Sequence, residues 1–326
     1  MATADQIKAL IRSHAAGDDD RFYSVAMQLA ASEAHVGHAR VAGELSKMID
    51  DARTRPAPRP ATSRPHALVQ PRGDLGELLL ATYPNQRLSH LVVADPIRVK
   101  LDRVVTETRH GDELRHHGLA PVRKLLLFGQ PGTGKTMTAS ALAGQLGLPL
   151  FSVRLDGLIT RFLGETAAKL RLIFDAMVQT RGVYFFDEFD ALGGERQMGH
   201  DVGEIRRVLN SFLQFIEQDE STSLIIAATN HVKLLDKALF RRFDQAIEYA
   251  LPSPVEVEKV LRNRVGDLDA SSIDWPQVVA AAAGLSHAEL SRAADHSAKD
   301  AVLAKSKVVD TAQLLAAIQD RHSFLR

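Results

Sequence analysis

The sequence predicts an α/β protein in which a parallel sheet is preceded by a small all-α unit and followed by a helical subdomain. Short apolar runs alternate with amphipathic helical patterns through the middle of the chain, which is typical of a parallel sheet covered by helices on both faces. After Pro252 and Pro254 the strand pattern stops, and helical periodicity continues to Arg326. The apolar runs are residues 124–128, 150–153, 183–186, 224–229 and 246–249.

These patterns divide the chain into four segments. We expect a helical docking domain at residues 1–52, a linker at 53–73, an α/β domain at 74–251 and a helical subdomain at 252–326. Ile7, Leu10 and Ile11 share one helical face in the first segment, and GDDD at 17–20 ends that helix and caps the next. The linker alternates proline with arginine, which favours an extended tether. Its arginines are either solvated or in contact with an acidic partner or nucleic acid.

Composition and charge narrow the classes of function. Lys+Arg and Asp+Glu both number 40, so no net charge draws the chain to nucleic acid or to an anionic membrane. The absence of cysteine excludes disulfides and thiolate metal sites, and suits a reducing cytosol. The N-terminus lacks a signal-peptide pattern, and no apolar stretch approaches the roughly 20 residues that span a bilayer. We therefore expect a cytoplasmic protein without a membrane partner.

The first apolar run leads into GQPGTGKT, residues 129–136, which matches G-x-x-x-x-G-K-[ST] between a strand and a helix. Backbone N–H groups of such a loop wrap phosphate oxygens, and the following helix adds its positive end. Lys135 is expected to reach the β- and γ-phosphates of ATP, and the Thr136 hydroxyl to ligate Mg²⁺. The predicted nucleotide-binding residues of this segment are Gly129, Gln130, Pro131, Gly132, Thr133, Gly134, Lys135, Thr136 and Met137.

Polar residues also follow the third and fourth apolar runs. The run at 183–186 ends in DEFD, so Asp187 is expected to hold Mg²⁺ together with Thr136, and Glu188 to polarise the attacking water. The next run ends in AATN, which brings Asn230 to the same edge of the sheet. Its amide either orients water against the γ-phosphate or belongs to a turn.

Together these segments resemble the AAA family of ATPases, within the wider AAA+ class, from about residue 91 to residue 294. The resemblance rests on GQPGTGKT (Walker A), VYFFDE (Walker B), AATN (sensor 1), LLDKALFRRFD (the arginine-finger segment) and DVGEIRRVLNSFLQFIE, which is similar to the helix after the second pore loop. It implies a P-loop AAA+ domain with a parallel five-stranded sheet of order 5-1-4-3-2 and a C-terminal helical lid. It also implies ATP and Mg²⁺ as cofactors, and a homo-oligomer that is usually a hexameric ring.

The resemblance further assigns roles to two other segments. Arg241 and Arg242 stand where the family has arginines that point at the γ-phosphate bound by the neighbouring subunit, where they neutralise developing charge. Phe162, Leu163 and Gly164 match the first pore loop, whose apolar side chains grip a polypeptide in the ring's channel. The alternative for this triplet is a buried helix start.

Several positions depart from the family pattern. Gln130 replaces a proline, which should be tolerated because the position contributes backbone. FRRFD lacks the Pro-Gly between the two arginines, so which arginine dominates is open. His287 and Ala288 are expected to contact nucleotide from the lid, but GLSHAEL stands where the family often has SGAD, and only Ala288 fits. Arg292 is either a phosphate sensor on the lid or a surface arginine.

Three kinds of function remain. The first, which we expect, is an ATPase that remodels, unfolds or disassembles a protein partner through a ring pore. The second is a nucleotide-gated regulator of a partner such as a protease encoded nearby, since the chain is loosely similar to small bacterial AAA proteins paired with subtilisin-like proteases. The third is a DNA-acting AAA+ ATPase, which the pore triplet, the neutral charge and the lack of a DNA-reading module oppose. No H-E-x-x-H or G-x-S-x-G motif occurs in the chain.

Overall fold

The computed structural model describes residues 70–158, 163–189, 202–231, 240–266 and 268–324, together with residues 25–27, 30 and 43. The chain divides into two compact units, Met1–Leu68 and Val69–Arg326. Apart from residues 25–27, 30 and 43, the helical domain expected at 1–52 lies outside the described residues, as does most of the linker expected at 53–73. The fold that follows is that of the second unit.

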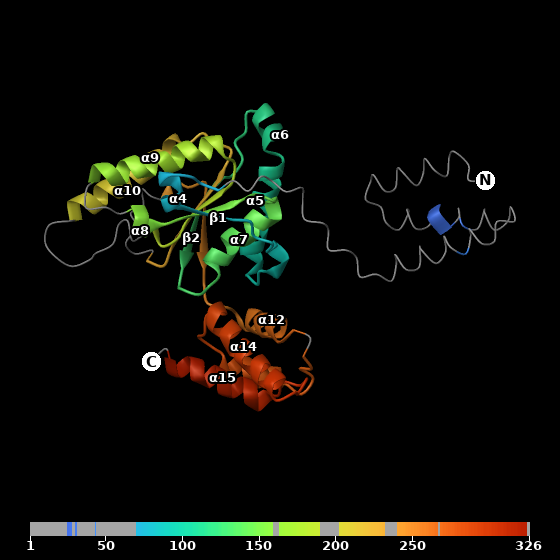
Figure 1. Ribbon diagram of the computed structural model, residues 1–326. Coiled ribbons are helices and arrows are strands. Elements are labelled where there is room, and N and C mark those ends of the chain that lie inside the picture. The colour runs from blue at the N-terminus through green and yellow to red at the C-terminus, as the bar shows by residue number, and fades with distance from the viewer. Residues whose placement is uncertain are drawn as a thin grey trace. The chain divides into compact units, whose positions relative to one another are not determined.

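The second unit is built on a six-stranded sheet (Figure 1). Its parallel strands are β2 (Lys124–Gly129), β3 (Leu150–Val153), β4 (Val183–Phe186), β5 (Leu224–Thr229) and β6 (Gln245–Tyr249). They lie side by side as β6-β2-β5-β4-β3, which is the expected order 5-1-4-3-2. The sheet differs from the expectation at one edge, because β1 (Leu79–Thr82) pairs antiparallel with β3 and adds a sixth strand.

The extra strand left little signal in the sequence. It follows α4 (Asp74–Leu78) without a break, and it has only four residues. Leu79 is buried while Leu80 is 46% exposed, so the two leucines read as one apolar run although they face opposite sides of the sheet. An edge strand this short cannot be told from a helix end by periodicity.

Helices cover both faces of the sheet, and each face has its own apolar core (Figure 1). The helices on the first face are α4, α8 (Leu155–Leu158), α9 (Leu163–Gln179) and α10 (Val202–Gln218). Those on the second face are η1 (Leu88–His90), α5 (Asp95–Arg109) and α7 (Lys135–Leu146), with the short α6 (Gly111–His116) following α5. All residues of β4 and β5 are buried, which explains why the sequence shows them as unbroken apolar runs.

An aromatic cluster fixes α9 and α10 against β4. The ring of Phe186, the last residue of β4, lies 6.2 Å from that of Phe174 on α9 and 4.9 Å from that of Phe212 on α10. Such pairs contribute about 0.5–1.5 kcal/mol each beyond their burial. The cluster therefore holds in place the strand end from which the acidic residues at 187 and 188 emerge.

After β6 the chain is helical. The helices are α12 (Pro254–Val265), α13 (Trp275–Ala281), α14 (His287–Leu303) and α15 (Thr311–Phe324). They enclose a separate core that includes Leu261, Val278 and Leu290. Ser253 starts α12 with a capping box, since its hydroxyl accepts from the Glu256 N–H while the Glu256 carboxylate accepts from the Ser253 N–H. Among the described residues, no helix combines the length and the apolar character needed to cross a bilayer.

Candidate functional site

The predicted site residues gather at the carboxyl edge of the sheet because of how the strands pair. β5 lies between β2 and β4, with Phe128 opposite Thr229 and Phe186 opposite Ala227. Parallel strands end at the same edge, so the loop at 129–136, Asn230, and the pair Asp187 and Glu188 emerge side by side. The structure thus brings together segments about 100 residues apart in the chain.

The glycine-rich loop is packed too closely for other residues at two positions. Gly129 has φ 142°, and a Cβ there would lie 2.0 Å from the carbonyl oxygen of Tyr249. Gly132 has φ 74°, and a Cβ there would lie 2.5 Å from the Ser286 hydroxyl oxygen. The loop is therefore held between the last strand and the lid, and both glycines are required by the close packing and the positive φ.

Lys135 begins α7 and folds back over this loop. Its side chain is largely buried, and its Nζ donates to the carbonyl oxygens of Gly129 (2.9 Å) and Gln130 (2.8 Å). Thr133 also donates to the Gln130 carbonyl, at 2.8 Å. The ammonium group thus lies beside the loop and the positive end of α7, where an anion gains from both charges. Gln130, Pro131 and Met137 are exposed around it.

Thr136 and Asp187 lie next to each other across the edge of the sheet. The Thr136 hydroxyl donates to Asp187 Oδ2 at 2.8 Å, and Asp187 Oδ1 accepts from the Glu188 N–H at 3.0 Å. Two neighbouring ligands of an octahedral Mg²⁺ with bonds of about 2.1 Å are roughly 3 Å apart. These two oxygens therefore have the chemistry and the spacing that a Mg²⁺ site requires.

Glu188 is exposed and has a left-handed backbone, with φ 50°. A non-glycine residue in this region costs free energy, and such strain concentrates at functional sites. The turn takes the chain from the buried Phe186 to the buried Phe189 while Glu188 remains in contact with solvent. Asn230 is half-buried on the neighbouring strand end.

The lid contacts the glycine-rich loop directly. The Ala288 N–H donates to the Gly132 carbonyl at 2.9 Å, and Ser286 caps α14 by accepting from the Glu289 N–H. Next to them, both ring nitrogens of His287 are buried and make no hydrogen bond within the described residues. Burial lowers the pKa of the His287 imidazole, and the nearby Glu256 carboxylate opposes that shift. The His287 imidazole is thus buried at the start of α14, between Ser286 and Ala288, which contact the loop.

Arg292 lies one turn further along α14. Its guanidinium donates to Glu289 at 2.7 Å, and its side chain is 65% exposed. The structure therefore places it on the lid surface in an ion pair, which matches the surface-arginine alternative.

The two candidate finger arginines lie away from their own nucleotide loop. They precede β6, whereas Gly129 pairs with Tyr249 at the other end of that strand. The length of β6, about 15 Å, separates the two places. Arg242 is half-buried and its Nε lies 3.2 Å from the Glu217 carboxylate, while Arg241 is exposed.

The pore-loop prediction is largely outside the described residues. Phe162 is not among them, and of Leu163 and Gly164 the structure describes only that they begin α9. The triplet therefore stays a prediction.

Sequence reasoning missed the contacts that hold α7 in place. The Thr138 hydroxyl lies 2.7 Å from the Tyr249 hydroxyl in a buried position, and burial raises the pKa of Tyr249. This pair ties the first turn of α7 to the end of β6. A tyrosine closing an apolar strand is the signal that could have indicated a buried hydrogen-bond partner.

Comparison with known proteins agrees with this geometry. The family model described as "ATPase family associated with various cellular activities (AAA)" matches residues 125–251. An uncharacterized AAA family ATPase of Sinorhizobium fredii, y4kL, is 34% identical over 331 residues, which covers 98% of this chain and 96% of that protein.

Two further similarities concern the AAA region. ATP-dependent zinc metalloprotease FtsH 4 of Sphaerobacter thermophilus is 32% identical over 240 residues, which covers 71% of this chain and 36% of that protein. The chain thus spans about a third of the length of this relative. The crystal structure of the FIGL-1 AAA domain matches with a TM-score of 0.59 and 22% identity, over 74% of this chain and 85% of that one. This last similarity concerns the fold alone.

The first prediction separates the two halves of the site. Lys135→Ala should abolish nucleotide binding because the ammonium beside the loop is lost, whereas Glu188→Gln should bind ATP and lose turnover by about 10²–10⁴-fold. Calorimetric ATP affinity and phosphate release measure the two effects. Glu220→Gln, which changes an exposed carboxylate after α10, is the control and should behave as wild type. Normal turnover by Glu188→Gln would remove that residue from the mechanism.

A second prediction concerns His287. Its pKa in the folded chain lies below the ordinary value of 6.5, so the unfolded chain takes up the proton first as the pH falls. The stability that the neutral ring contributes is present above that ordinary value and is lost as the pH falls through the lowered pKa. Urea unfolding at pH 7.5 and pH 5 should show a smaller loss in His287→Leu than in wild type. An equal loss of stability in both proteins would contradict the lowered pKa of His287 in the folded chain.

Proposed function

The chain belongs to the AAA family of ATPases, and we propose that it hydrolyses ATP in a hexameric ring in order to remodel, unfold or disassemble a protein partner. The observation that carries the proposal is the group at one edge of the sheet: Lys135 folded over the glycine-rich loop, and the Thr136 hydroxyl on the Asp187 carboxylate. These residues fit a nucleotide with its metal ion.

We assign the residues as follows. Backbone N–H groups of the loop and Lys135 bind the phosphates, with the lysine exchanging the carbonyls of Gly129 and Gln130 for phosphate oxygens. Thr136 and Asp187 would hold Mg²⁺, which would neutralise phosphate charge when bound. Glu188 accepts the proton of the attacking water, and Asn230 orients that water.

The position of Arg241 and Arg242 supports action between subunits. Both lie at the opposite end of β6 from their own glycine-rich loop, too far to touch a phosphate bound there. In a ring, the same arginines face the next subunit's site, where a guanidinium stabilises the charge of the transferred phosphoryl group. In a closed ring, every subunit has a neighbour on each side, so each nucleotide site receives arginines from the next subunit.

We propose a protein as the substrate. The FtsH relatives are named ATP-dependent zinc metalloproteases, and the match to them covers the region that contains the ATPase motifs. The H-E-x-x-H motif does not occur in this chain, so we place any proteolysis in a separate partner. Residues 1–52 would dock that partner, and residues 53–73 would tether the docking domain to the rest of the chain. Residues 74–251 would form the ATPase domain, and residues 252–326 would form its lid. The cysteine-free sequence suits activity in the cytoplasm.

The shared site can be tested by mixing two inactive variants. Arg242→Ala keeps the nucleotide loop and lacks the finger, whereas Lys135→Ala keeps the finger and lacks the loop. Each alone should be nearly inactive, but the mixture should recover part of the wild-type ATPase rate, with a dependence on protein concentration. Mixed oligomers are verified with differently sized tags. Absence of recovery in verified mixed oligomers would mean that Arg242 does not act on the neighbouring subunit's nucleotide.

Phe162 tests the threading part of the proposal. Phe162→Ala should leave ATP binding, assembly and basal hydrolysis near wild type, while unfolding of a tagged protein substrate falls by about tenfold or more because the aromatic contact is lost. Phe162→Tyr, which keeps the ring, is the matched control and should retain most of that activity. If Phe162 instead belongs to a core, its truncation should cost about 3–5 kcal/mol of unfolding free energy, with ATPase activity lost in proportion. Thermal melting separates the two outcomes.

A further inference from the structure

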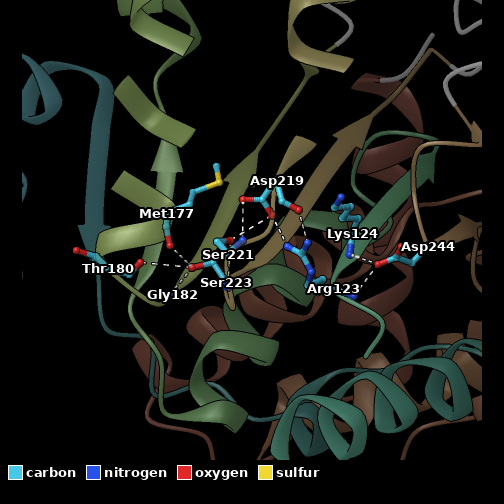
Figure 2. A network of polar contacts seen from close by, with 9 residues as sticks. All are labelled: Arg123, Lys124, Met177, Thr180, Gly182, Asp219, Ser221, Ser223 and Asp244. Carbon is cyan, nitrogen blue, oxygen red and sulfur yellow. Dashed lines mark hydrogen bonds and ion pairs between the residues drawn. The ribbon is translucent and has the colours of Figure 1, made fainter. Parts of the chain in front are cut away.

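Figure 2 shows an ion pair between Arg123 and Asp219. It lies at the amino end of β2, whereas the glycine-rich loop follows the carboxyl end of the same strand. Arg123 directly precedes β2, and Asp219 directly follows α10. The guanidinium donates both to the Asp219 carboxylate and to the Asp219 carbonyl oxygen. The Asp219 side chain is 1% exposed and that of Arg123 is 20% exposed. Because the Asp219 carboxylate is buried, breaking the pair would leave a desolvated charge.

A chain of hydrogen bonds leads from this pair to the end of α9. The Asp219 carboxylate accepts from the N–H and hydroxyl of Ser221, and the Ser221 hydroxyl accepts from the Ser223 N–H. The Ser223 hydroxyl donates to the Met177 carbonyl at 3.0 Å, in the last turn of α9. Figure 2 shows these residues in one continuous network with Arg123. The pair therefore joins the carboxyl ends of α9 and α10.

The same arginine also holds the finger segment. The backbone N–H groups of Arg123 and Lys124 both donate to Asp244 Oδ2, each at 2.8 Å. Asp244 follows Arg242 by two residues, and Arg242 pairs with Glu217, which precedes Asp219 by two residues. The contacts thus close a ring in which α10 and the finger residues are connected both through Arg123 and through the pair of Arg242 and Glu217.

The two connections differ in strength. Arg242 and Glu217 have side chains that are 33% and 66% exposed, so water and salt screen their attraction. In the Arg123–Asp219 pair the carboxylate is buried, and the half-buried guanidinium reaches Asp219 through two donors. Arg123 therefore connects Asp244, two residues after Arg242, with the end of α10, through its backbone N–H on one side and its guanidinium on the other.

We propose that Arg123 and Asp219 are positioning residues for the trans-acting arginines, holding the finger segment and the end of α10 in the geometry that hydrolysis on the neighbouring subunit requires. The proposal rests on the proposed function, in which Arg242 acts between subunits. It assigns Arg123 and Asp219 no contact with the nucleotide of their own subunit. Their loss should therefore affect the subunit that gives the finger and spare the subunit that holds the nucleotide.

Mixed rings allow the subunit that supplies the finger and the subunit that binds the nucleotide to be tested separately. Asp219→Asn, which keeps the shape and removes the charge, is placed either in the Lys135→Ala subunit, which supplies the finger, or in the Arg242→Ala subunit, which supplies the nucleotide loop. The recovered ATPase rate should fall by about fivefold or more in the first arrangement and by less than about twofold in the second. In a ring of Asp219→Asn alone, kcat should fall while the KM for ATP stays near wild type.

Two variants guard against loss of folding. Arg123→Lys keeps both charges and removes the forked contact, so it should show the same asymmetry with a smaller loss. Asp175→Asn, an exposed change on α9, should leave both arrangements unaffected. Equal losses in the two arrangements would reduce the pair to a structural role and overturn the proposal. If the parent mixture of Lys135→Ala and Arg242→Ala shows no recovery at all, the trans-acting finger itself fails, and the positioning proposal falls with it.

Discussion

Everything in the candidate site depends on the parallel pairing of β5 between β2 and β4. All residues of β4 and β5 are buried, so the hydrogen-bonded ladders lie in an apolar environment that leaves the register no freedom to slip. The pairing sets the glycine-rich loop, Asn230 and Asp187 side by side. The contact of Thr136 with Asp187 at 2.8 Å is a consequence of that register, since α7 and β4 do not adjoin in the chain.

The same strands separate two polar regions with different tasks. At the carboxyl edge, polar groups such as the Asp187 carboxylate and the loop backbone lie near solvent, where a ligand can reach them. At the amino edge, Asp219 and the serines that follow it are buried and satisfied by each other. A buried network of this kind fixes positions rather than binding ligands. The sheet thus acts as a rigid spacer between the glycine-rich loop and the arginines that precede β6.

The sequence allowed prediction of what depends on local pattern. The five parallel strands were predicted to within one residue at each end, because strands buried on both faces appear as unbroken apolar runs. The glycine-rich loop was recognisable because its spacing is set by the geometry of phosphate binding. The strand β1 was not predictable in this way, because four residues joined to a helix carry no period of their own. The pair of Arg123 and Asp219 was not predictable either, because the two residues lie 96 positions apart in the chain. Locally, the sequence shows only polar residues at every second position, 219, 221 and 223, before an apolar strand.

The lid contains residues outside the sequence motifs that nevertheless shape the site. Gly132 must lack a side chain because Ser286 lies where its Cβ would be, and its carbonyl accepts from Ala288 at 2.9 Å. Any shift of the loop that follows phosphate binding must therefore stretch this bond or move the start of α14 with it. Because α14 packs into the separate core of the lid, a movement at its first turn is carried to α12 and α15 as a unit. Gly132 thus joins the glycine-rich loop to the lid, through the space left by its missing side chain and through its carbonyl group.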